Sequence, residues 1–169
     1  MFKLDENIVK TVTDRISGFL GNDLLESSVS MDMPVFTSES SRIVDLLKFL
    51  HDEPDLQFCF LTTLCGVHYP EKDEFSVVYH LHSFQLNLRI RLKINIPVSK
   101  PEVKTATRVF SAANWMERET YDFYGIIFTG HPDLKRILNV DEMDYFPMRK
   151  EYPLEDDTRD DKDDKMFGR

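Results

Sequence analysis

The stretch LRIRLKINI, residues 88–96, decides the fold of this chain. Successive side chains of a β-strand point to opposite faces, so alternate residues share a face. One face of this strand is expected to be apolar and the other polar, with Leu88, Ile90, Leu92, Ile94 and Ile96 on the first and Arg89, Arg91, Lys93 and Asn95 on the second. This alternation is typical of an antiparallel strand that packs a core on one side and meets water on the other.

The neighbouring segments extend this strand into a sheet. Residues 75–81 alternate in the same way and predict the other strand of an antiparallel hairpin. Residues 29–35 predict a half-buried strand, the apolar run 56–67 a buried strand, and residues 126–128 a short one. Helical spacing of apolar residues predicts helices over 7–20, 40–52 and 112–124, and residues 97–104 are expected to form a loop. Residues 1–140 therefore predict an α+β, two-layer domain with helices packed on a mostly antiparallel sheet.

The last segment, residues 141–169, has a different composition. It carries 11 acidic and 6 basic side chains, a net charge of −5 out of −9 for the whole chain, and its few apolar residues follow no period. Such a segment cannot build a core of its own. We expect an extended acidic strap, mobile or directed away from the domain from about Pro147 onward, with Tyr152, Leu154 and Phe167 as anchors on a partner. A floppy tail is the alternative on composition alone.

Composition excludes several functional classes. The net charge of −9 argues against strong binding to nucleic acid, which depends on neutralising phosphates. No stretch approaches the roughly 20 apolar residues of a membrane-spanning helix, and the N-terminus does not resemble a secretory signal. Any membrane attachment is therefore expected to come through another protein.

The candidate metal ligands do not form a set. Cys59 and Cys65 lie in the run predicted as a buried strand, about 20 Å apart by strand rise, and are interpreted as reduced core cysteines. His80 and His82 share a strand face about 6.6 Å apart, but without a third ligand they are interpreted as a solvated or core pair. An iron-sulfur cluster needs about four ligands, so we expect no redox centre on this chain.

Charged side chains and a histidine that could form a site are concentrated in residues 114–138. Arg118 and Asp122 are spaced i,i+4 with the base first, the less favourable order for an isolated helix. We therefore expect a buried or half-buried ion network, in which the turn Gly130-His131-Pro132 folds the following segment back over the helix; its members would be Glu117, Arg118, Glu119, Asp122, His131 and Arg136. An acid/base hydrolase using His131 with Glu119 or Asp122 is the rival interpretation.

This segment resembles the signature of the 30 kDa subunit family of respiratory complex I. The matching residues are Glu117, Arg118, Glu119, Asp122, Gly125, Gly130, His131, Pro132 and Arg136, followed by Arg149 and Lys150 in Pro-Met-Arg-Lys-Glu-Tyr-Pro. The resemblance covers roughly residues 30–158. One departure is Asp144-Tyr-Phe-Pro147, where the family usually has a glycine.

The resemblance implies a structural subunit in the peripheral arm of a proton-pumping NADH:quinone oxidoreductase, so the enzyme is the whole complex. FMN, iron-sulfur clusters and quinone would be bound by partner proteins and none by this chain. The strap would lie along the neighbour that resembles the forty-nine-kilodalton component of complex I, with Arg149 and Lys150 at the interface. The complex would stand on the cytoplasmic face of the bacterial inner membrane. An equivalent component of a ferredoxin-, F420H2- or hydrogenase-type complex remains an alternative.

Overall fold

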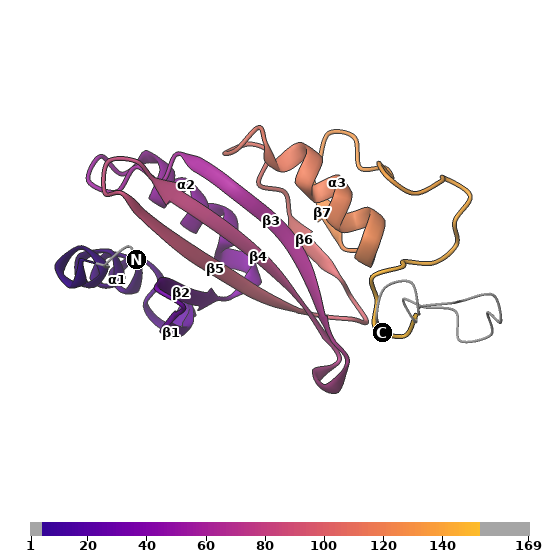
Figure 1. The fold of residues 1–169 in the computed structure, drawn as a ribbon, viewed down its shortest axis with the longest axis horizontal. Coiled ribbons are helices and arrows are strands. Elements are labelled where there is room, and N and C mark those ends of the chain that lie inside the picture. Colours follow the sequence, from indigo (N-terminus) through magenta and orange to yellow (C-terminus); the bar gives the residue numbers. More distant parts are fainter. Residues whose placement is uncertain (1–4, 153–169) are drawn as a thin grey trace, which may run out of the picture.

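The computed structural model describes residues 5–152 and contains a five-stranded sheet of order β1-β2-β5-β4-β3 (Figure 1). The strands are β1 Leu24–Ser30, β2 Met33–Ser38, β3 Phe60–Tyr69, β4 Glu74–Ser83 and β5 Leu88–Pro97. All neighbouring strands are antiparallel except β2 and β5, which are parallel. The predicted mostly antiparallel sheet is confirmed.

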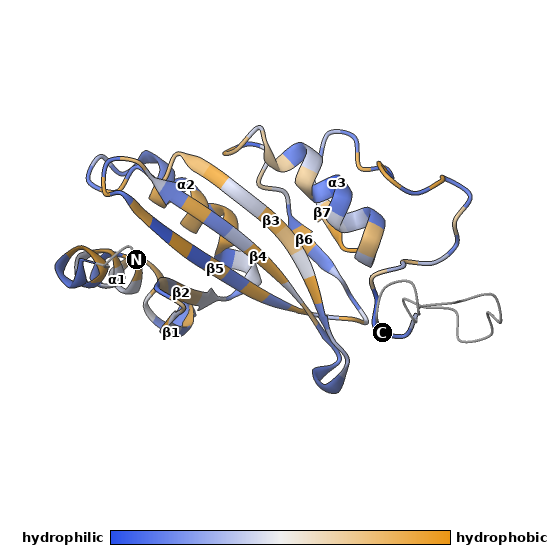
Figure 2. Cartoon of the chain, in the orientation of Figure 1, coloured by the Kyte–Doolittle hydropathy of each residue, from blue (hydrophilic) through white to orange (hydrophobic). Residues whose placement is uncertain are grey.

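The central hairpin of β4 and β5 follows the sequence pattern. Tyr79 lies opposite Leu92 and Val77 opposite Ile94, so the apolar residues of both strands share one face. All four are fully buried. Figure 2 shows the resulting stripes along β5, where hydrophobic and hydrophilic residues alternate. β5 is therefore the middle strand of the sheet, with one face in the core.

Three helices cover the apolar face. They are α1 Glu6–Leu20, α2 Ile43–Asp52 and α3 Ala113–Tyr124, close to the three predicted ranges, and the α+β two-layer architecture is confirmed. Their buried residues, such as Ile16, Leu47 and Ala113, join the strands in one hydrophobic core. No helix within residues 5–152 is long and apolar enough to cross a membrane.

The first strand prediction was wrong in its extent. Residues 29–35 do not form one strand, because Met31 and Asp32 have φ of 48° and 61° and turn the chain back between β1 and β2. Two consecutive positive φ values are typical of the tight turns that join hairpin strands. Apolar alternation continues through this turn, which hides it in the sequence.

The interpretation of the cysteines was also wrong. The run 56–67 turns at Gln57, with φ of 43°, and β3 begins only at Phe60. Cys59 therefore precedes the strand, and both Cys59 and Cys65 are exposed. β3 is the last strand of the sheet, and its outer side has no covering layer within residues 5–152, so a cysteine there is not a core residue.

The expected loop 97–104 contains a short strand, β6 Glu102–Lys104. It pairs in parallel with β7 Ile127–Thr129, the strand predicted at 126–128, and forms a second, two-stranded sheet. This pairing positions Thr105 and Ala106 beside α3. A parallel pair between residues 25 apart has no local sequence signal, which explains why β6 was missed.

Residues 141–152 contain no helix or strand, yet they lie against the domain. The backbone N–H of Met148 donates to the carbonyl of Phe123 at 3.1 Å, and that of Lys150 donates to His68 Nδ1 at 3.0 Å. The expectation that the chain leaves the domain from Pro147 is therefore wrong for residues 147–152. Leu154 and Phe167 lie outside the described residues.

Candidate functional site

Helix α3 is seated on β3 at a glycine. A Cβ on Gly66 would lie 2.8 Å from Tyr124 Cδ2 and 3.1 Å from Thr120 Cγ2, both on α3. Only a residue without a side chain allows this approach. The helix that carries the predicted motif is thus fixed against the sheet, and its side chains reach the segments on either side of it in the sequence.

Asp122 organises the segment after the helix. It is fully buried, and its Oδ1 accepts from Arg136 Nη1 at 2.7 Å. Its Oδ2 accepts from three consecutive backbone N–H groups, those of Ile137, Leu138 and Asn139, at 3.1, 2.8 and 2.9 Å. Burial pushes the pKa of Asp122 upward, but the hydrogen bonds from the backbone and from Arg136 outweigh it and hold the pKa well below its ordinary value.

Two arginines complete the fold of this segment. Arg136 also donates from Nη2 to the carbonyls of Met143 and Tyr145, at 2.7 and 3.0 Å. Arg118 donates from Nη2 to the carbonyl of Arg136 at 2.9 Å and lies over the Trp115 ring. Both guanidinium groups therefore hold backbone carbonyls that no helix or strand satisfies.

Glu117 points to the other side of α3. It is fully buried and accepts from Thr105 Oγ1 and from the backbone N–H of Ala106, each at 2.6 Å. Burial raises the pKa of Glu117 to about 7, although these two hydrogen bonds oppose the shift. Glu117 thus joins α3 to the end of β6.

His131 follows the glycine turn, where Gly130 has φ of 85°. Its Nδ1 accepts from the backbone N–H of Asp133 at 3.1 Å, which leaves Nε2 to donate to the carbonyl of Asn114 at 3.1 Å. Pro132 lies between them, exposed. The predicted fold-back of this turn toward the helix is what these contacts show.

Arg149, in the last described segment, binds the C-terminal end of α3. Its Nε donates to the carbonyl of Tyr124 at 2.8 Å, and its guanidinium lies 5.2 Å from the ring centre of Phe75 and 4.7 Å from that of Phe146. Gly125, with φ of 75°, allows this, since a Cβ there would lie 2.6 Å from Phe146. Lys150 contributes its backbone, while its side chain is exposed.

The predicted residues therefore form two groups on different sides of α3 rather than one network: Asp122, Arg136 and Arg118 lie on one side, and Glu117 on the other. Asp122 pairs with Arg136, Glu117 binds the β6 side, and Arg118 binds backbone carbonyls. Glu119 is not part of these groups. The oxygens of Asp122 and both nitrogens of His131 are engaged by structural partners, so these residues do not assemble an acid/base pair.

The segment 134–152 presents an apolar surface, which the sequence predicted only for the part from residue 141 onward. We call it the strap patch; its exposed residues are Leu138, Val140, Tyr145, Met148 and Tyr152. Leu138 is 65% exposed although Asp122 anchors its backbone. The aromatic residues and methionines after residue 141 were the sequence signal for a partner surface, whereas Leu138 and Val140 precede that segment and were missed. Apolar and aromatic side chains held outward on an ordered backbone are typical of protein interfaces.

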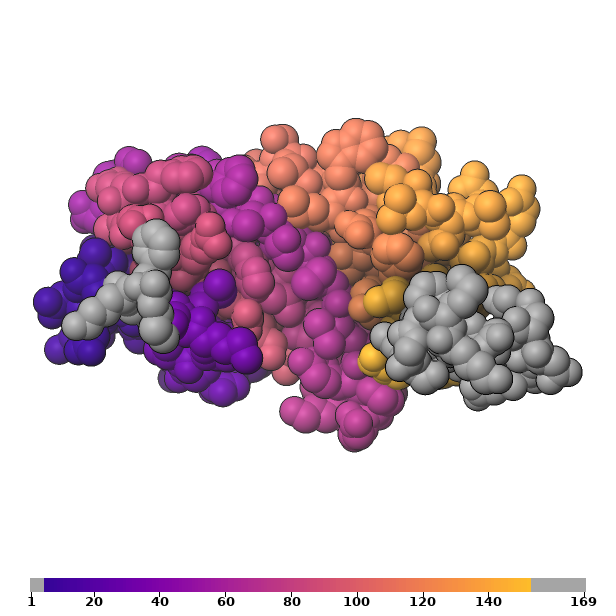
Figure 3. Space-filling view, viewed as in Figure 1, coloured from indigo at the N-terminus to yellow at the C-terminus, as the bar shows by residue number. Residues whose placement is uncertain are grey.

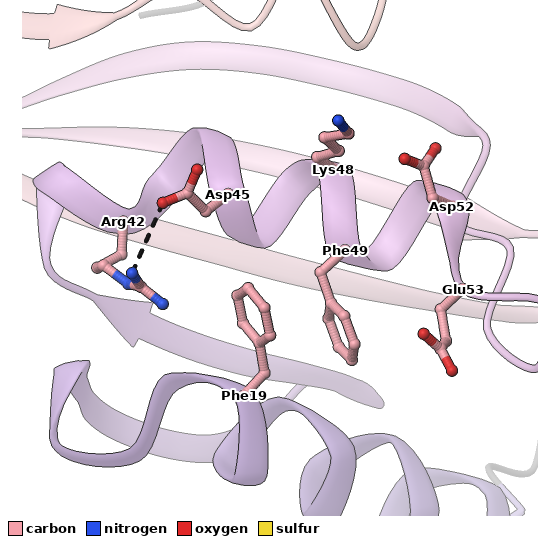
Figure 4. A pocket seen from close by; sticks show the side chains of 7 residues that line it. All are labelled: Phe19, Arg42, Asp45, Lys48, Phe49, Asp52 and Glu53. Atoms are coloured by element: carbon pink, nitrogen blue, oxygen red, sulfur yellow. Dashed lines mark ion pairs between the residues drawn. The ribbon is translucent and has the colours of Figure 1, made fainter.

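No group of three or more His, Cys, Asp or Glu side chains among residues 5–152 could hold a metal ion. One shallow hollow of about 480 Å³ lies between α1 and α2, away from α3 (Figures 1 and 4). Phe19 and Phe49 stack in it with ring centres 4.3 Å apart. The rest of its lining is charged, from Arg42, Asp45, Lys48, Asp52 and Glu53.

A family model described as the respiratory-chain NADH dehydrogenase 30 kDa subunit matches residues 36–158. This chain belongs to that family. Relatives similar to it carry the name of the C subunit of NADH-quinone oxidoreductase. The protein from Methylorubrum extorquens is 42% identical over 150 residues, 88% of this chain and 68% of that protein. The one from Herpetosiphon aurantiacus is 50% identical over 119 residues, 70% of each chain.

Two solved structures share the fold of this chain. A chain of the membrane-bound sulfane sulfur reductase, an archaeal respiratory membrane complex, has a TM-score of 0.72 at 22% identity, covering 86% of this chain and 85% of that one. A trypsin-resistant fragment of Nqo5 has a TM-score of 0.58 at 24% identity, covering 75% of this chain and 99% of the fragment. These likenesses support the architecture alone.

Proposed function

We propose that this chain is a non-redox structural component of a proton-pumping NADH:quinone oxidoreductase and holds its forty-nine-kilodalton-like neighbour, the D-type component, through the strap patch. Family membership supports a place in this multi-subunit enzyme. The observation that carries the structural role is the strap patch, whose apolar side chains are exposed on a backbone fixed by Asp122 and Arg136.

The strap patch suits docking because hydrogen bonds within the chain already order its backbone before a partner binds. Surfaces that become ordered only on binding lose part of their interaction energy to that ordering. Here the N–H groups of residues 137–139 are already bonded to Asp122, and the carbonyls of Met143 and Tyr145 to Arg136. Leu138 and Met148 are then free to bury apolar area on the partner, while the exposed Lys150 can form charged contacts at the rim.

The redox reactions of the complex would take place on the neighbouring proteins. FMN and the iron-sulfur clusters would carry electrons from NADH, and quinone would be reduced in a cavity built by partner proteins, with this chain on the cytoplasmic side of the bacterial inner membrane. The composition of the chain supports this division, since two cysteines are fewer than the roughly four ligands of one cluster. No feature of the described residues favours a ferredoxin-, F420H2- or hydrogenase-type complex.

A pull-down with the tagged D-type partner tests this proposal. The double variant Leu138→Glu/Met148→Glu is expected to lose most of the captured partner, because charges would enter an apolar contact. The control is Leu25→Glu/Val29→Glu, which puts the same changes on exposed residues of β1. Equal capture by wild type and the Leu138/Met148 variant would reject the strap patch as the docking site.

A further inference from the structure

The outer face of the sheet, which none of the three helices covers, carries a row of basic side chains. Arg89, Arg91 and Lys93 alternate along β5 and point away from the core residues between them. None of the three forms an ion pair with a carboxylate within residues 5–152, while the chain as a whole has a net charge of −9. We call this row with its neighbours on β3 and β4 the open face; Figure 3 looks onto it.

The open face is held in a defined geometry. Arg91 Nε donates to His80 Nε2 at 2.9 Å across the β4–β5 pair, which fixes the guanidinium beside the strand. The Lys93 ammonium lies 5.9 Å from the centre of the Tyr69 ring. Because His80 accepts this bond, it is neutral, and burial followed by Arg91 lowers its pKa. The positive charge therefore comes from the three residues of β5.

One end of the row is aromatic. Phe60 and Phe84 are 48% and 68% exposed, with ring centres 5.7 Å apart, and His82 lies 4.6 Å from Phe84. His82 is paired with Arg89, so this aromatic cluster adjoins the first base of the row. Exposed aromatic groups beside unpaired cations are an arrangement that protein partners use, the ring as anchor and the charges for register.

We propose that the open face docks an extended acidic segment of a second protein, with alternate carboxylates on Arg89, Arg91 and Lys93 and an apolar residue on Phe60 and Phe84. In an extended chain every second side chain recurs at about 6.7 Å, the same repeat as the basic row, so the two rows match without bending either. This surface is on the opposite side of the sheet from α3 and is independent of the strap patch.

An acidic polypeptide fits this face better than a nucleic acid does. Val35 and Val78 beside Arg91 and Lys93 are buried, so the apolar position of this face is the exposed pair Phe60 and Phe84 next to the charged row. An extended peptide can alternate side chains to meet both kinds of position. A nucleic acid carries a charge on every nucleotide along its whole length, so the long-range repulsion from a net charge of −9 acts on more charges than in a peptide with three carboxylates.

The test uses the full chain and a fluorescent peptide of one phenylalanine followed by three Ser-Glu repeats, read by anisotropy at low salt. Wild type is expected to bind it more tightly than a peptide of the same composition with its three glutamates adjacent. The variant Arg89→Glu/Arg91→Glu/Lys93→Glu is expected to weaken binding at least about tenfold, since attraction becomes repulsion at each site. The variant Arg89→Gln/Arg91→Gln/Lys93→Gln is expected to have an affinity between those of wild type and the Glu variant.

The matched control is Lys10→Glu/Lys48→Glu/Arg108→Glu, which changes the net charge equally on the helical side and in a loop. It is expected to alter the affinity by less than about threefold at the same ionic strength. A melting curve of each variant separates loss of binding from loss of folding. Equal weakening by the control, no preference for the alternating peptide, or tighter binding of a thymidine oligonucleotide would each overturn the proposal.

Discussion

Asp122 is a single buried carboxylate that determines the path of a segment 14 to 17 residues further along the chain. Replacing it with alanine would leave the Arg136 guanidinium and three backbone N–H groups without their acceptor. We expect Asp122→Ala to lower the free energy of unfolding by about 3–5 kcal/mol, since an unpaired buried charge remains. Urea denaturation of the purified chain measures this.

Asp133 provides the control for that change. It also pairs with a cation, Lys135 at 2.8 Å, but both side chains are exposed. Asp133→Ala is therefore expected to change the free energy of unfolding by no more than about 0.5 kcal/mol. Equal midpoints for Asp122→Ala and Asp133→Ala would show that Asp122 does not organise the segment.

The buried Glu117 is expected to make the free energy of unfolding depend on pH. Its folded-state pKa of about 7 lies above the ordinary 4.5, so the folded state binds an extra proton between these values. The stabilisation is complete below about pH 4.5 and is lost as the pH rises through 7. Between about pH 5 and 8 we expect wild type to lose about 2–3 kcal/mol more than Glu117→Gln, whose amide can keep the bonds to Thr105 and Ala106.

Urea unfolding of both proteins at the two pH values provides the comparison. The other titrating groups are shared, so they cancel in the difference between the two proteins. Stability that changes with pH in parallel for wild type and Glu117→Gln would mean that Glu117 ionises at its ordinary pKa despite its burial.

At the scale of elements, periodicity predicted what depends on neighbours in the sequence. The strand at residues 88–96 and helix α3 with its glycine end could be predicted because burial on one face imposes a repeat. The turn at Met31 and Asp32 could not, because the apolar alternation runs on through it. β6 could not either, since its partner β7 is distant in the sequence.

The seating of α3 on β3 can be tested at Gly66. A Cβ there would be 2.8 Å from Tyr124 Cδ2, so Gly66→Ala is expected to cost about 1–3 kcal/mol through overpacking. Gly18→Ala in α1 is the opposite case, because a Cβ there meets nothing within 4 Å, and we expect a gain of about 0.5–1 kcal/mol. Thermal melting distinguishes the two signs. A neutral Gly66→Ala would show that α3 is not fixed at this contact.

At the scale of the whole molecule, the sequence did not predict how the charged residues of α3 connect to other segments. Glu117, Arg118 and Asp122 were expected in one network, yet Arg118 and Asp122 bind the segment after the helix while Glu117 binds the end of β6. The direction of a side chain from a helix and the return path of residues 134–152 are set by tertiary packing. The acidic composition of residues 141–169 likewise gave no sign that Arg149 and Phe146 pack on the domain.

Residues 141–152 of the strap pack on the domain, so their removal is expected to destabilise it. A chain ending at Asn139 loses Arg149 and its contacts with Tyr124 and Phe75, so we expect a drop of about 1–3 kcal/mol in the free energy of unfolding. A chain ending at Tyr152 keeps these contacts and is expected to unfold like the full chain. Identical melting of all three chains would show that residues 140–152 do not stabilise the domain.

The structural role itself is tested most directly by NADH:quinone activity per assembled complex in membranes carrying Leu138→Glu/Met148→Glu. Native gels give the amount of assembled complex, and the rate of quinone reduction is divided by that amount. A chain that only holds its neighbour predicts less assembled complex but an unchanged rate per complex. Normal assembly combined with a lost rate of quinone reduction would contradict the structural role and assign this chain a part in the chemistry.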